Sequence, residues 1–100
     1  MGQIYTSGDW LVKEGCEEEF IAAWEEMASW TAKTIETATW ANLLRDDENP
    51  RLFRSFGPWD SRETVALWRE MSGFRERVGS IRELIESLDA KTMEVAVAIG

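Results

Sequence analysis

Three of the six tryptophans, Trp40, Trp59 and Trp68, lie in segments that we expect to meet around one cavity. An apolar wall with few polar groups is the usual lining of a pocket for a small organic molecule. Two neutral side chains could supply those groups: the Asn42 amide, which can donate to a substrate oxygen, and the Ser55 hydroxyl. The alternatives are an amide satisfied by the backbone, for Asn42, and a small packing residue, for Ser55. We predict a ligand pocket, with Trp40 and Asn42 as substrate-binding residues.

The chain contains no histidine, which removes several common kinds of catalytic site. Without imidazole there is no Ser-His-Asp triad, no haem held by histidine and no common zinc site. The single cysteine, Cys16, has no disulfide partner within the chain, and the glutamates at 17–19 oppose formation of a thiolate. The acidic run at 46–48 could attract a hard cation, but its composition is typical of a turn. We therefore expect no metal site and no histidine base.

The overall composition is that of a small, acidic, folded protein. Its 100 residues are 44% hydrophobic, which suits one globular domain over 1–100. The 11 Lys and Arg against 19 Asp and Glu leave a formal net charge of −8, which disfavours nucleic acid and anionic membranes as partners. No segment approaches the roughly 20 apolar residues of a membrane span, and the first residues do not resemble a secretory signal. These features predict a cytoplasmic protein.

Hydrophobic periodicity predicts the elements that would position the pocket residues. Alternation over 4–13 is typical of a strand, in which Gly8 indicates a bulge or a close backbone approach. Apolar residues at helical spacing predict a first helix over 16–33. Two more alternating segments, 39–45 and 51–57, form a hairpin around a polar turn. In the first of these strands Trp40, Asn42 and Leu44 would share a face.

A second helical region begins at Asp60, which forms a capping box with Glu63, and breaks at 72–73. The apolar stripe of a third helix follows, at Phe74, Val78, Ile81, Ile85 and Leu88. A last strand is expected over 91–99. The order βαββαβ is that of the ferredoxin-like fold, an α+β fold with a four-stranded antiparallel sheet and helices on one face.

The predicted strands carry large apolar residues in both registers, for example Leu11 beside Trp10 and Leu43 beside Trp40. A sheet covered on one face only should be polar on its other face. An apolar face of this size marks an interface. We therefore expect a homodimer that packs sheet against sheet.

Several stretches of the sequence carry a family resemblance. They are WLVKEG at 10–15 with Phe20, FGPWDS at 56–61, LWR at 67–69 and SGF at 72–74. Together they resemble the antibiotic biosynthesis monooxygenase (ABM) family, over about 4–99. The fold that this resemblance implies is a dimeric α/β barrel.

The resemblance implies a cofactor-independent monooxygenase that oxidises an aromatic quinol, anthrone or polyketide-like substrate with dioxygen. Such substrates are electron-rich and acidic, so that the anion itself can reduce dioxygen. In the quinol and anthrone branch of the family, a Trp that opens the second helical region matches Trp59. A polar residue four positions earlier, often Asn, corresponds to Ser55. By this resemblance Trp59, Trp68 and Ser55 are the expected catalytic residues.

The haem-degrading branch of the family fits less well. Its Trp corresponds to Trp68, but its iron-binding histidine falls at about Val78 and its asparagine at about Gly8. Two other functions stay open beside the oxygenase. One is a binding module without catalysis, which needs no base. The other is an isomerase or cyclase with a carboxylate of raised pKa as its base.

The three remaining tryptophans have a structural interpretation. Trp24, and with it Trp10 and Trp30, is expected to pack in the core or an interface.

Overall fold

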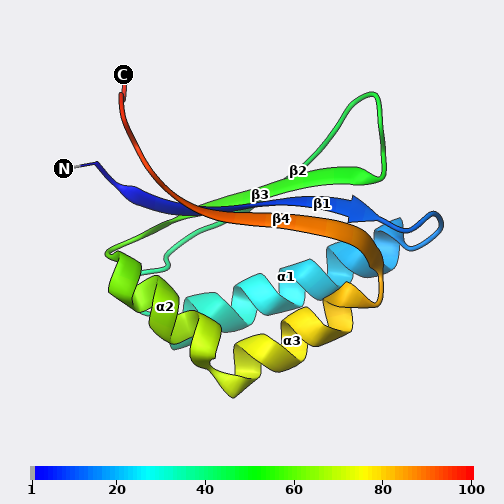
Figure 1. Ribbon diagram of the computed structural model, residues 1–100, viewed down its shortest axis with the longest axis horizontal. Helices are drawn as coiled ribbons and strands as arrows, with labels where there is room; N and C mark the ends of the chain where they lie inside the picture. The colour runs from blue at the N-terminus through cyan, green and yellow to red at the C-terminus, as the bar shows by residue number, and fades with distance from the viewer. Residues whose placement is uncertain (1) are drawn as a thin grey trace.

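The computed structural model describes residues 2–100, and its elements follow the predicted order (Figure 1). The strands are β1 (Ile4–Val12), β2 (Asn42–Arg45), β3 (Leu52–Trp59) and β4 (Ile85–Glu94). The helices are α1 (Glu17–Thr34), α2 (Arg62–Glu70) and α3 (Ser72–Arg82). The sheet order is β2-β3-β1-β4 and each neighbouring pair is antiparallel. All three helices cover one face of the sheet, so the predicted ferredoxin-like α+β fold is confirmed (Figure 1).

Local chemistry fixes the ends of α2. The cap is Ser61 rather than the predicted Asp60, because the Ser61 hydroxyl accepts a hydrogen bond from the Thr64 backbone N–H at 3.2 Å. Met71 then adopts an extended backbone conformation, which separates α2 from α3. The two helices therefore meet at an angle and cover different parts of the sheet (Figure 1).

The predicted third helix and last strand are wrong at their boundary. Ile85 and Leu88 were assigned to the helical stripe, but α3 ends at Arg82 and both residues lie in β4. The register between β1 and β4 shifts between Leu11 and Val12, so that Leu88 faces Trp10 and Ile85 faces Val12. This irregularity places two residues three apart on one face of a strand, and that spacing imitates a helix.

The segment before β2 also differs from its prediction. The strand spans only Asn42–Arg45, so Trp40 lies in the preceding loop. Leu43 pairs with Ser55 in β3, while Asn42 pairs with Phe56. Alternation therefore places Asn42 on the outer face of the sheet, the face that carries no helix.

Two clusters of buried side chains form the core between the sheet and the helices. The larger one surrounds Phe20 and Phe53, whose rings lie 5.0 Å apart. The smaller one surrounds Trp59 and Val65 at the other end of the sheet. Burying a large apolar side chain contributes about 1.5–3 kcal/mol. A cavity lies between the two clusters and is lined by residues of both. Within residues 2–100, no helix has the length and apolar character needed to cross a membrane.

Candidate functional site

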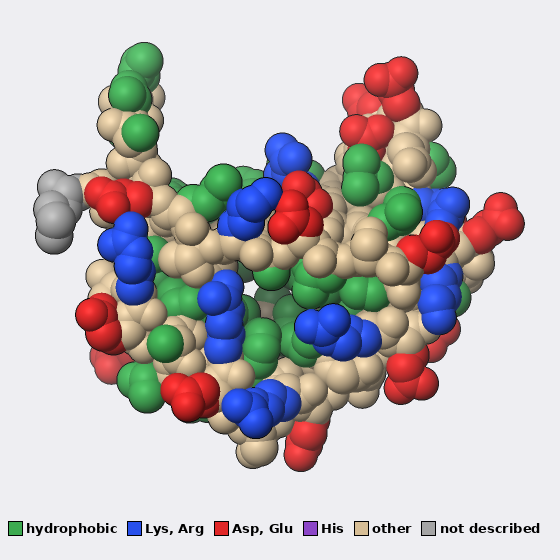
Figure 2. Space-filling model, in the orientation of Figure 1, with side chains coloured by type: hydrophobic (Ala, Val, Ile, Leu, Met, Phe, Trp, Pro, Cys, Tyr) green, Lys and Arg blue, Asp and Glu red, His purple; other side chains and the backbone are tan. Residues whose placement is uncertain are grey.

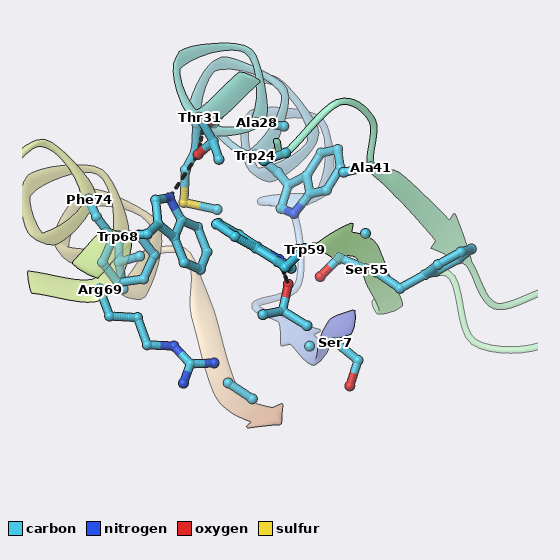
Figure 3. A pocket seen from close by; sticks show the side chains of 18 of the residues that line it. Ser7, Trp24, Ala28, Thr31, Ala41, Ser55, Trp59, Trp68, Arg69 and Phe74 are labelled. Atoms are coloured by element: carbon cyan, nitrogen blue, oxygen red, sulfur yellow. Dashed lines mark hydrogen bonds between the residues drawn. The ribbon is translucent and has the colours of Figure 1, made fainter. Parts of the chain in front are cut away.

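A cavity of about 300 Å³ lies between the sheet and the helices (Figure 3). Its lining comes from both core clusters, including Trp10 and Met27 of the larger cluster and Trp59 and Ala38 of the smaller one. Pockets for small organic ligands begin at about this volume. The cavity therefore has the size and position of a binding site for a compact aromatic molecule.

Small residues on the inner face of the sheet create this space. Thr6 and Gly8 of β1 lie opposite Gly57 and Ser55 of β3. Ala90 of β4 lies opposite Gly8 on the other side. Since side chains alternate along a strand, these residues all point toward the helices, and none of them fills the gap.

Aromatic rings form the wall of the cavity that faces these small residues of the sheet. The rings of Trp59 and Trp68 lie 4.8 Å apart, and those of Trp68 and Phe74 lie 4.2 Å apart. Figure 3 shows Trp59 between Trp68 and Trp24, with Ser55 beyond it. Tilted and offset rings at such distances attract one another, so the wall is a rigid apolar surface.

Three tryptophans of the cavity lining each donate a hydrogen bond from the indole N–H to a hydroxyl oxygen. The pairs are Trp10 to Ser55 at 2.9 Å, Trp59 to Thr6 at 2.9 Å, and Trp68 to Thr31 at 3.0 Å. Buried indoles usually require such a partner. These three indoles therefore have no free N–H to offer a ligand, which directs attention to the hydroxyl groups as donors of the lining.

The three hydroxyls differ in what they do with their own protons. Thr31 Oγ1 donates to the carbonyl oxygen of Met27 at 2.9 Å, so its proton is not available to a ligand. Within residues 2–100, Ser55 and Thr6 accept from an indole but donate no hydrogen bond. A hydroxyl carries one donor and two acceptor positions. Ser55 and Thr6 are thus two available O–H donors in the lining of the cavity.

The charged groups of the lining are both cationic. Among the residues of 2–100 that line the cavity, Arg69 and Arg82 alone carry a charge. Three carboxyl groups have a lowered pKa, and all lie outside the lining. A hydrogen bond from Arg54 lowers the pKa of Asp9, hydrogen bonds from Thr64 and Thr37 lower that of Asp60, and one from Arg62 lowers that of Glu94. The part of the lining formed by residues 2–100 therefore contains no carboxylate base.

The structure places four of the five residues singled out from the sequence in the lining of the cavity. Trp59, Trp68 and Ser55 line the cavity from β3 and α2. Trp40 is 45% exposed and also contributes to the lining, but its ring lies 5.9 Å from that of Phe56 on the outer face. Asn42 is exposed and lies outside the lining.

Several other residues of the lining were not predicted from the sequence. Trp10 and Trp24, interpreted there as packing residues, both line the cavity, whereas Trp30 lies against Arg77 with the guanidinium 4.6 Å from its ring. Thr6 lies on the inner face of β1 together with Gly8. The small residues on that face were the sequence signal that could have predicted Thr6 as part of the cavity lining. No sequence pattern pointed to Arg69.

The structure belongs to the class of small α+β proteins with a ferredoxin-like fold, here with a cavity lined by aromatic rings between the sheet and the helices. Within this class, residues 7–79 match the family model for antibiotic biosynthesis monooxygenase, and the chain belongs to this family. No curated protein matches the sequence.

Solved structures share the fold at low sequence identity. SnoaB, a cofactor-independent oxygenase from Streptomyces nogalater, superposes with a TM-score of 0.89 at 14% identity, covering 99% of this chain and 98% of that chain. A conserved protein from Methanosarcina mazei has a TM-score of 0.83 at 16% identity, with 94% and 93% covered. A protein of unknown function from Bacteroides thetaiotaomicron has 0.81 at 20% identity, with 94% and 98% covered. These similarities concern the fold.

Proposed function

We propose that this protein is a cofactor-independent monooxygenase that oxidises an aromatic quinol, anthrone or polyketide-like substrate in the cavity. The observation that carries the proposal is the pair of available hydroxyl donors, Ser55 and Thr6, set in a wall of aromatic rings. Family membership and the structural similarity to SnoaB, which is a cofactor-independent oxygenase, support the same reaction class.

The cavity suits a flat aromatic substrate. The rings of Trp59, Trp68 and Phe74 offer faces and edges for stacking. Because the indole N–H groups are tied to hydroxyls, these rings are held in place before a ligand arrives. A preorganised wall lowers the entropy that binding costs.

For an anthrone, the reaction converts the central CH₂ and O₂ into a carbonyl group and water. Loss of one C–H proton to solvent gives a carbanion whose charge spreads onto the ring oxygen. One electron passes to O₂, and the two radicals combine to form a C–O bond. The peroxide anion takes up a proton to form a hydroperoxide. The second C–H proton then leaves as the O–O bond breaks, which gives the carbonyl and a hydroxide ion, and the hydroxide takes up a proton to become water.

Ser55 and Thr6 stabilise the charge that develops in this sequence. Each hydroxyl accepts from an indole N–H, which polarises it and leaves its own proton free to be donated to a ligand in the cavity. Hydrogen bonds to a developing oxyanion in a site of low polarity are a major source of rate enhancement. Ser55 and Thr6 are therefore the catalytic donors, and Trp59 holds Thr6 while it forms part of the wall.

Oxygen uptake tests the proposal. Metal-depleted protein is incubated with a panel of anthrones and naphthalene-type quinols, and oxygen consumption is compared with autoxidation in buffer. Uptake proportional to protein concentration with at least one substrate is the expected result. Uptake at the autoxidation rate with every member of the panel would count against the oxygenase.

A binding module without catalysis is the second candidate, because the lining contains no carboxylate or imidazole base. The same observation gives no support to an isomerase or cyclase that depends on a carboxylate. A titration followed by tryptophan fluorescence separates the two candidates. Quenching without oxygen uptake favours the binding module, and quenching with uptake favours the oxygenase.

A homodimer that packs sheet against sheet completes the proposal. The outer face of the sheet carries several exposed apolar side chains: Trp40, Leu44, Leu52 and Met93. It lies between two projections, the loop that joins β2 to β3 and the tail that follows β4 (Figure 2). Exposed apolar surface of this kind favours association. We assign the protein to the cytoplasm as part of the same proposal.

A further inference from the structure

The arginines of this chain divide into two groups. Five of the eight form ion pairs with carboxylates: Arg45, Arg51, Arg54, Arg62 and Arg77. Within residues 2–100, Arg69, Arg75 and Arg82 form no ion pair. Two of these three, Arg69 and Arg82, line the cavity, and Arg75 does not. In a chain with a net charge of −8, the lining thus has two unpaired cations and no acid.

The positions of Arg69 and Arg82 on their helices do not explain why both arginines lack an ion pair and also line the cavity. Arg69 lies in the last turn of α2 and Arg82 in the last turn of α3, where a cation interacts favourably with the helix dipole. That interaction does not require the side chain to face the cavity. Figure 3 shows the Arg69 side chain running along the edge of the cavity, and Figure 2 shows a hollow below β4 with basic side chains on either side.

From this arrangement we infer that Arg69 and Arg82 form an anion subsite at the mouth of the cavity, so that the natural ligand is an aromatic molecule with a carboxylate on its periphery. The rings occupy the space among Trp59, Trp68 and Phe74, and the carboxylate stays at the mouth. Arg69 is half-buried and Arg82 is exposed, so the anionic group keeps contact with water and is not fully desolvated. This inference names the substrate class of the proposed oxygenase and rests on that site.

Binding of a matched ligand pair tests the subsite without any turnover. Anthraquinone-2-carboxylate and 2-(hydroxymethyl)anthraquinone have the same ring system, and both are already oxidised at the central carbons. Dissociation constants are measured by tryptophan quenching at low and high salt. The carboxylate is expected to bind about tenfold more tightly at low salt, and salt should reduce this preference.

Variants assign the preference to the two arginines. Arg69→Gln and Arg82→Gln should each reduce the preference for the carboxylate about threefold, and the double variant should abolish it. Arg69→Lys, which keeps the charge, should retain most of it. Arg75→Gln is the matched control, since Arg75 is exposed, unpaired and outside the lining, and it should change nothing.

Equal affinity of the wild-type protein for the two ligands would overturn the inference, as would a preference that survives in the double variant. Neither result depends on oxygen chemistry. Conversely, a carboxylate preference together with oxygen uptake at the autoxidation rate would support the subsite and count against the oxygenase.

Discussion

The indole N–H of Trp10 donates to the hydroxyl of Ser55 at 2.9 Å, and this bond passes directly over Gly8. Gly8 pairs with Ser55 across the β1–β3 ladder, and Trp10 reaches back from two residues along the strand. A Cβ atom at Gly8 would lie 2.9 Å from the indole nitrogen and 3.1 Å from the Ser55 oxygen. Of the bulge and the close backbone approach that the sequence left open at Gly8, the structure shows the close approach, made by two side chains that meet over the glycine, while the register shift lies between Leu11 and Val12.

Removing the Ser55 hydroxyl should separate its structural role from its chemical role. Ser55→Ala leaves the Trp10 N–H without a partner, which should lower the free energy of unfolding by about 1–3 kcal/mol. It also removes a donor from the cavity, which should lower the rate of oxygen uptake about 10²-fold. Urea unfolding and an oxygen electrode measure the two effects.

Thr31→Val is the matched control for Ser55→Ala. It leaves the Trp68 N–H unpaired in the same way, but the hydroxyl it removes already donates to Met27. We expect a similar loss of stability and a change in rate of only a few-fold. If both variants lose activity equally, the Ser55 hydroxyl has no special role in the reaction.

Two glycines of α3 should respond to alanine with opposite signs. A Cβ at Gly73 would overlap the Trp30 ring, which Arg77 covers, so Gly73→Ala should destabilise the protein by about 1–3 kcal/mol. A Cβ at Gly79 meets nothing within 4 Å, and Gly79→Ala should stabilise it by about 0.5–1 kcal/mol. Urea denaturation of the two variants measures this difference. Shifts of the same sign would mean that Trp30 does not pack on α3 in solution.

The proposed dimer depends on the outer face of the sheet. Light scattering should give the wild-type protein twice the 11.5 kDa mass of one chain. Leu44→Glu places a charge on that face and should reduce the mass to that of one chain. Leu67→Glu, on the exposed side of α2, should leave the mass unchanged. A wild-type mass of 11.5 kDa, or equal behaviour of the two variants, contradicts the dimer.

Stability should fall in acid. The folded protein holds the pKa of Asp60 below its usual 3.8, through hydrogen bonds from Thr64 and Thr37, and that of Glu94 below its usual 4.5, through Arg62. A lowered carboxyl pKa contributes stability that is fully present above the unfolded value and is lost as the pH falls through the folded value. Thermal unfolding measured from about pH 6 down to about pH 2.5 should show this loss of stability begin as the pH falls below about 4.5. Thr37→Val should make the loss smaller, and an unchanged pH profile in this variant would show that the Thr37 hydrogen bond does not contribute.

Much of the fold followed from alternation and helical spacing, because each element has one buried face. Thr6, Gly8 and Trp10 share a face in the sequence pattern and in the structure. Trp59 and Trp68 both line the cavity, where the end of one strand and the following helix were expected to meet. Local pattern could place these residues because their neighbours along the chain decide which way they point.

Pattern failed where longer-range pairing decided the outcome. The irregularity opposite Val12 gives Ile85 and Leu88 a helical spacing inside a strand, and only the register with β1 reveals it. The short β2 strand places Asn42 on the outer face through its pairing with Phe56. Arg69 and Arg82 could not be assigned to the cavity, since the direction of a long flexible side chain depends on the surface it lies against.

The most direct test of the central claim is the fate of isotopically labelled dioxygen in a reaction of metal-depleted protein with an anthrone. Mass spectrometry of the product should show one labelled oxygen at the central carbon, formed at a rate proportional to protein concentration and strongly reduced in Ser55→Ala. Product that carries no label, or labelled product that forms no faster than in buffer, would contradict the account.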